Sequence, residues 1–140
     1  MNKNIPTHQT KNMKKDFKTW ITLKQNIHHN GLCKFYHERE VWWCSLGVNV
    51  GFEQDGGGLE KQRPVLILKG LSRHTCLVVP LTSSAHTHQY RIPMGVFQGE
   101  KASAIISQIR VVDTKRLVEK IDYIDKTLFE IIRKAARDML

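Results

Sequence analysis

The sequence predicts a mainly β protein: a small, partly closed β-barrel with one helix before the strands and one after them. Two observations carry this prediction. About five short apolar segments follow one another in the middle of the chain, separated by tight polar and glycine-containing turns. Apolar residues then recur with helical spacing near both ends of the chain. Short strands with tight turns and a terminal helix are typical of small barrels.

The N-terminal part predicts a tail and a docked helix. Residues 1–14 are polar and basic, and we expect a loose tail there. Asp16 can cap a helix and Gly31 can stop it. Helical spacing between them links Phe17, Trp20, Ile21, Lys24 and Ile27. A helix this short needs tertiary contacts, so we expect its Phe17/Trp20 face to dock, either on its own domain or over a partner groove or active site.

The strands are expected between residues 39 and 112, with a polar glycine-rich loop over residues 47–62 and turns near residues 69–73 and 95–101. The expected strands cover residues 40–46, 64–68, 75–81, a fourth that begins at 88–92, and a long fifth at 103–112. Trp42 and Trp43 point to opposite faces of the first strand. One should be core; the other could stack on a base, lie at a dimer interface or also be core.

The C-terminal part predicts a basic connector and a helix. The connector covers residues 114–116, and a short segment continues to Ile124. Asp125 or Thr127 can cap the final helix. Its apolar face is marked by Leu128, Ile131, Ile132, Ala135 and Met139.

Composition limits the class of protein. With 140 residues the chain is one domain, which we place at residues 39–140, plus an appendage at residues 1–38. No apolar run approaches the ~18 residues of a membrane span, and no secretory signal is visible. The three cysteines Cys33, Cys44 and Cys76 have no C-x-x-C spacing, so a zinc site or disulfide framework is not expected. We expect a cytoplasmic protein with Cys44 and Cys76 in its core.

The net charge of +9 favours a polyanionic partner, either nucleic acid or an acidic protein. A phosphate site is indicated where two strands end. The glycine-rich loop carries Glu53, Gln54 and Asp55 and leads to Arg63, while the strand at 75–81 leads into Thr82, Ser83 and Ser84. An arginine fork and hydroxyls at strand ends suit a phosphate group.

Five segments, in this order, resemble the MazF/PemK family of toxin–antitoxin endoribonucleases. They are Arg39-Glu40-Val41-Trp42-Trp43, Gly51-Phe52-Glu53-Gln54, Arg63-Pro64-Val65-Leu66-Ile67, Val79-Pro80-Leu81-Thr82-Ser83, and Ser107-Gln108-Ile109-Arg110-Val111-Val112-Asp113 followed by Arg116-Leu117. The chain departs from the family in three respects: residues 55–62 lengthen the loop, Glu40 replaces a usual glycine, and the first forty residues lie outside the pattern.

The resemblance implies an SH3-like barrel of about five to seven mostly antiparallel strands that works as a homodimer. It implies cleavage of single-stranded RNA without a metal or other cofactor, and neutralisation by a cognate antitoxin. Arg63 matches the essential arginine, which we expect to stabilise charge on the phosphoryl group. Thr82 matches the catalytic hydroxyl. Glu53 is the candidate general base toward the 2′-OH, a role that needs a raised pKa or close geometry.

The resemblance also suggests RNA contacts. Gln54 fits a base edge or backbone contact, and Ser83 and Ser84 are secondary candidates for phosphate. Gln108 and Arg110, two apart on the expected fifth strand, should face the same side: the first would read a base edge, the second would hold a phosphate or stack on a base.

His86 and His88 suggest acid–base chemistry or a basic groove, because two ligands alone make a poor zinc site. The alternative function is a non-catalytic SH3-like barrel that binds nucleic acid, or a protein target as gyrase-poisoning toxins do. Those toxins lack the pairing of Arg63 with Thr82.

Overall fold

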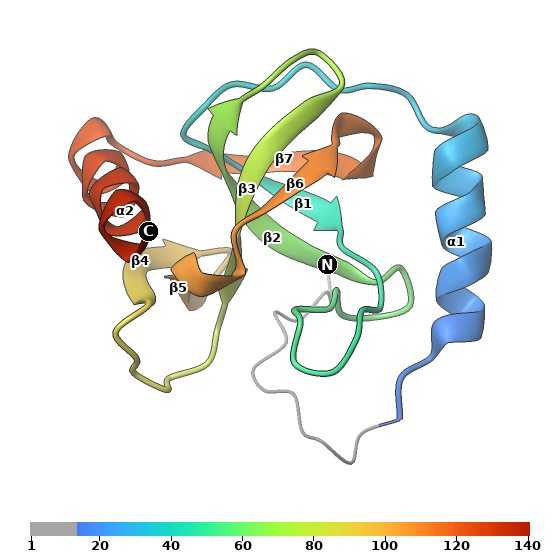
Figure 1. Cartoon of the computed structure of the whole chain (residues 1–140), viewed down its shortest axis with the longest axis horizontal. Coiled ribbons are helices and arrows are strands. Elements are labelled where there is room, and N and C mark those ends of the chain that lie inside the picture. The colour runs from blue at the N-terminus through green and yellow to red at the C-terminus, as the bar shows by residue number, and fades with distance from the viewer. Residues whose placement is uncertain (1–13) are drawn as a thin grey trace.

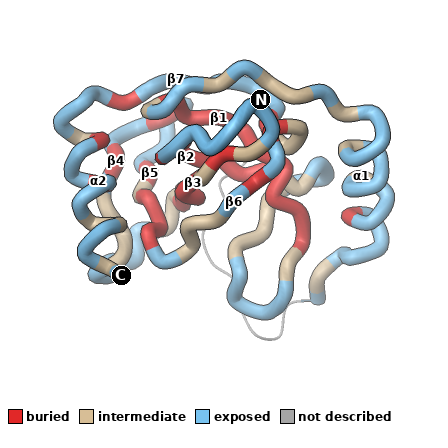
Figure 2. The backbone as a smooth tube through the Cα atoms, turned by 45° about the horizontal axis from the view of Figure 1, so that its top comes forward, coloured by how far each residue is buried: buried red, intermediate tan, exposed pale blue. Residues whose placement is uncertain are grey.

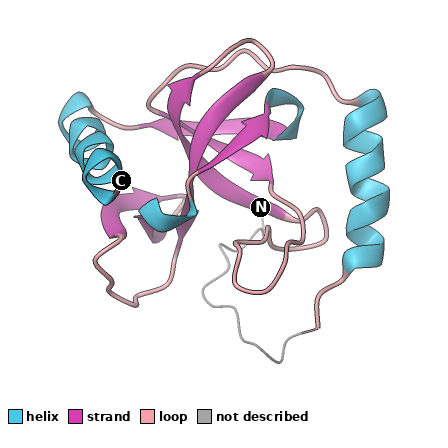
Figure 3. Cartoon of the chain, in the orientation of Figure 1, coloured by secondary structure: helices cyan, strands magenta, loops and turns pink. Residues whose placement is uncertain are grey.

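The computed structural model describes residues 14–140 and contains one curled antiparallel sheet between two helices (Figures 1 and 3). The strand order is β4-β5-β3-β2-β1-β7, and β6 also pairs with β3. The prediction of a mainly β, partly closed barrel with a helix before and after it is confirmed. The elements are α1 (Phe17–Asn30), β1 (Glu40–Ser45), β2 (Gln62–Gly70), β3 (Thr75–Thr82), β4 (Arg91–Phe97), β5 (Glu100–Ile105), β6 (Arg110–Asp113), β7 (Leu117–Tyr123) and α2 (Lys126–Met139).

The expected fifth strand is wrong in one respect. Residues 103–112 form the end of β5, a 3₁₀ turn η1 (Ile106–Gln108) and the start of β6. β5 pairs with the last two residues of β3, whereas β6 pairs with Thr75–Val78. The turn, which buries Ile106, lets the chain follow one edge of β3 as the sheet curls. Gln108 and Arg110 therefore do not share one face of a strand.

The turn expected at residues 95–101 is confirmed, but it is shorter than predicted. β4 continues to Phe97, and the hairpin closes through Gln98 and Gly99, both with positive φ. Gly95 lies inside β4 at a register shift, with φ +93°. Gly95 therefore marks a β-bulge rather than a chain reversal.

The core lies on both faces of the central strands β1, β2 and β3, which carry most of the buried residues (Figure 2). On one face, Val41, Leu66 and Val79 form one core cluster with Phe129 and Ile132 of α2. The apolar face expected for that helix is confirmed for Ile132 but not for Ile131, which is 50% exposed, and the buried Phe129 lies outside the expected face. The other face buries Trp42, Val65, Val78 and both predicted core cysteines. Trp43 is buried too, so both tryptophans are interior residues.

Helix α1 lies on the side of the barrel opposite α2 (Figure 1) and makes few contacts with the barrel. Asp16 caps it by accepting from the Thr19 amide, and Gly31 ends it, as predicted. Only Trp20 is buried; Phe17 is 45% exposed, so the expected Phe17/Trp20 docking face is reduced to one side chain. The expected tail falls, apart from Lys14, outside the described residues. Among residues 14–140, no helix has the length and apolar character to cross a membrane.

Candidate functional site

Arg63 and Thr82 meet where β2 begins and β3 ends. The two strands pair antiparallel with Val65 opposite Pro80, and continuing that register by two residues sets Arg63 opposite Thr82. Side chains alternate along a strand, so Arg63 shares a face with Val65 and Thr82 shares it with Val78. That face is the one turned away from α2. The β2–β3 pairing thus brings together the two residues singled out first.

Arg63 is held by the main chain on both sides. Its Nε donates to the Asp55 carbonyl oxygen at 2.7 Å, and its Nη1 donates to the Leu81 carbonyl oxygen at 2.8 Å. The residue is only 3% exposed. Burial lowers the pKa of Arg63 to about 10, with the nearby Asp55 acting to raise it and Arg91 to lower it. At neutral pH the guanidinium therefore keeps its positive charge, in a site mostly screened from water.

The hydroxyls after β3 order the loop that follows. The Thr82 Oγ1 accepts from the Ser84 amide at 3.2 Å, and the Ser84 Oγ accepts from the His86 amide at 3.2 Å. Thr82 is 2% exposed, Ser83 and Ser84 are half-buried, and the His86 side chain is exposed. Arg91 donates to the His86 carbonyl oxygen at 3.2 Å. Arg91 is a second cation of this site that sequence reasoning missed; its position at the expected start of the fourth strand was the available signal.

The loop between β1 and β2, residues 46–61, carries Glu53 and Gln54 and is organised from within. Asp55 accepts from the Asn49 amide at 2.7 Å, and the Asn49 side chain donates to the Gln54 carbonyl oxygen at 2.8 Å. The exposed Glu53 carboxylate accepts from the Val50 amide at 3.0 Å. Asp55, rather than Glu53, is the loop residue whose main chain contacts Arg63.

Gln108 closes the loop from the far side. Its Oε1 accepts from the Gln54 amide at 3.4 Å, and its Nε2 donates to the Phe52 carbonyl oxygen at 3.3 Å. The side-chain amide of Gln108 is thus hydrogen-bonded to the loop in this structure. Arg110 lies two residues on, half-buried at the start of β6 opposite Val78. The predicted pair thus comes from two elements, η1 and β6, instead of one strand.

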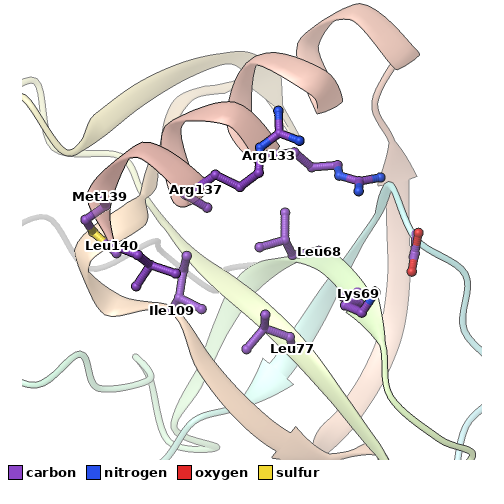
Figure 4. A pocket seen from close by; sticks show the side chains of 10 residues that line it. Leu68, Lys69, Leu77, Ile109, Arg133, Arg137, Met139 and Leu140 are labelled. Carbon is purple, nitrogen blue, oxygen red and sulfur yellow. The ribbon is translucent and has the colours of Figure 1, made fainter.

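A separate hollow of about 390 Å³ lies between α2 and the strands (Figure 4). Its floor is apolar, with Leu68, Leu77 and Ile109, and Arg133 and Arg137 of α2 stand at its edge. It contains none of the site residues expected from the sequence. Among residues 14–140, no three His, Cys, Asp or Glu side chains gather in a way that could hold a metal ion.

The fold and the residues at the strand ends define a small barrel of the kind found in toxins of toxin–antitoxin modules. The family model described as "PemK-like, MazF-like toxin of type II toxin-antitoxin system" matches residues 37–140. The chain belongs to this family, and the resemblance seen in the sequence is confirmed.

Solved structures agree with the fold. The chain is similar to the Mycobacterium tuberculosis toxin MazF-mt6, at 16% identity over 71% of this chain and 94% of the other, with a TM-score of 0.56. It is similar to MazF from Deinococcus radiodurans at 18% identity over 76% and 96%, with a TM-score of 0.61. A mycobacterial endoribonuclease in complex with its cognate antitoxin matches at 17% identity over 74% and 93%, with a TM-score of 0.57. No curated protein matches the sequence significantly.

Proposed function

We propose that this toxin is a sequence-selective endoribonuclease that cleaves single-stranded RNA without a metal ion. The observation that carries the proposal is the charged, buried fork of Arg63 joined to the strand end that bears Thr82. Family membership supports it. So does the net charge of +9, which attracts a polyanion.

In the proposed reaction, the ribose 2′-OH loses its proton and attacks the adjacent phosphorus, and the bond from phosphorus to the 5′-oxygen breaks. The leaving 5′-oxygen takes a proton from solvent water, which yields a 2′,3′-cyclic phosphate and a 5′-OH. Arg63 stabilises the charge that develops on the non-bridging oxygens, since a fixed donor fork in a site of low water content is suited to that task. Thr82 donates a hydrogen bond to a phosphate oxygen. Glu53 accepts the proton of the 2′-OH, and its loop brings it to the phosphate when RNA is bound.

The remaining predicted residues bind RNA in this proposal. Ser83, Ser84 and His86 follow Thr82 and contact the backbone, while Gln54, Gln108 and Arg110 contact bases or phosphates. The protein acts as a homodimer in the cytoplasm, and a cognate antitoxin neutralises it. A similar solved structure supports the last point, because it is an endoribonuclease in complex with its cognate antitoxin.

The test is cleavage of a long single-stranded RNA in excess chelator, with analysis of the product ends. Arg63→Ala should lower the rate by about a hundredfold to a thousandfold while the circular dichroism spectrum is retained. Arg73→Ala is the matched control, because Arg73 is exposed at the turn between β2 and β3 and carries the same charge. Full activity in Arg63→Ala would refute the site, and binding without cleavage would favour the non-catalytic alternative.

A further inference from the structure

The N-terminal extension, which the family model does not cover, is tied to the loop over the proposed site. Lys15 lies just before α1, and its Nζ donates to the carbonyl oxygens of Asn49 at 2.5 Å and Gly51 at 2.7 Å. The same ammonium pairs with the Asp55 carboxylate at 3.3 Å. Both charged side chains of this ion pair are largely buried. One cation thus joins three points of the loop.

Trp20, one helical turn further on, fixes the helix in place. A Cβ atom added to Gly47 would lie 2.1 Å from the Trp20 ring, so the ring rests directly on the Gly47 backbone. The guanidinium of Arg116 lies over the Trp20 ring, 5.7 Å from its centroid, and donates to the carbonyl oxygens of Ser45 and Leu46. The helix start is therefore anchored at the point where the loop leaves β1.

The loop held in this way contacts the proposed catalytic arginine. Its Asp55 carbonyl oxygen accepts from Arg63, and Arg63 and Thr82 are 3% and 2% exposed. A phosphodiester cannot reach a guanidinium that is buried to this degree. Access therefore requires the loop to move, and the bonds from Lys15 exist only while it stays closed.

We propose that Lys15 and Trp20 are positioning residues that latch the β1–β2 loop over Arg63 and Thr82, so that RNA reaches the arginine only after this contact opens. The chemistry of the proposal rests on the proposed function, whereas the latch itself does not. A protein whose binding-competent state is a minor fraction binds its ligand more weakly in proportion to that fraction. Loss of the latch therefore strengthens apparent RNA binding without improving the chemical step.

The first test measures access to Arg63 without any RNA. The probe is an arginine-selective dicarbonyl reagent, with modification at Arg63 followed by peptide mass spectrometry. Lys15→Met should speed the labelling of Arg63 about tenfold, as expected for loss of a charged hydrogen bond. Lys18→Met removes the same charge from an exposed position of α1 and should label like the unmodified chain. Lys15→Arg should restore slow labelling, and Trp20→Ala should act like Lys15→Met. Equal labelling rates in all these proteins would overturn the latch.

The second test separates KM from kcat with a single-stranded RNA that the unmodified chain cuts. Lys15→Met should lower KM by up to about tenfold with no rise in kcat. The control Lys18→Met should raise KM slightly, because it only removes a charge that attracts RNA. A KM in Lys15→Met that is unchanged, or raised as in the control, would contradict the latch. If the unmodified chain cuts no RNA, the proposed function fails, and the labelling experiment still decides on the latch.

Discussion

Replacing Gly47 by alanine should release helix α1 from the barrel. Gly47 has φ +81°, and an added Cβ would lie 2.1 Å from the Trp20 ring. The left-handed conformation costs an alanine about 1–2 kcal/mol. The clash is the larger effect: Trp20 is 96% buried, being only 4% exposed, and a buried tryptophan removes ~150–250 Å² from water. At ~25 cal/mol per Å² this amounts to roughly 4–6 kcal/mol as an upper limit.

Gly99→Ala is the matched control, because Gly99 has the same φ of +81° and nothing within 4 Å of its added Cβ. The assay is acrylamide quenching of tryptophan fluorescence together with thermal unfolding. All three tryptophans are buried, so quenching should be weak in the unmodified chain and in Gly99→Ala. In Gly47→Ala, Trp20 should become accessible, with an additional stability loss of about 3 kcal/mol if the helix and barrel unfold together. If Trp20 stays protected and both variants lose equal stability, the account of α1 docking is wrong.

Two further predictions concern the barrel itself. Glu40 is buried, and burial acts to raise its pKa. Hydrogen bonds from Trp42 and His37 and the ion pair with Lys120 outweigh this effect and leave the pKa below the ordinary value of a glutamate. The ionised form thus stabilises the fold above the ordinary pKa of a glutamate, and this contribution disappears as the pH falls through the lowered pKa of Glu40. Glu40→Gln should cost about 1–3 kcal/mol at pH 7, and the difference from the unmodified chain should shrink in unfolding curves measured at acid pH. Ile132→Ala should lower the free energy of unfolding by ~2–5 kcal/mol, measured by denaturant unfolding. The neighbouring Ile131 is 50% exposed, so Ile131→Ala should lower it by about 1 kcal/mol or less. Equal losses in the two variants would contradict the packing of α2.

The features that depend on short-range patterns could be predicted from the sequence. Asp16 caps the first helix as expected, and Asp125 is the one of the two candidates, Asp125 and Thr127, that caps the second. These caps could be predicted because capping involves residues three apart. Arg63 and Thr82 could be placed at strand ends because apolar runs mark β2 and β3 clearly. That they lie next to each other follows from the antiparallel pairing of consecutive strands.

Other features depend on contacts that no local pattern shows. Residues 103–112 read as one strand because nothing in them marks η1, which is imposed by the curl of the sheet along β3. Gly95 reads as a turn residue, since a bulge and a turn both favour glycine. The contacts of Lys15 join positions 34 to 40 residues apart, and only the folded barrel brings them together.

The placement of Arg63 and Thr82 on inner strands has a consequence for how this protein can evolve. Their spacing is fixed by β2–β3 pairing in the middle of the sheet, so a substitution that shifts it also threatens folding. Glu53 and Gln54 lie instead on the irregular loop of residues 46–61, where an insertion would leave the strands untouched. If the proposed function holds, substrate preference can change through the loop and the extension, while strand pairing keeps Arg63 and Thr82 together.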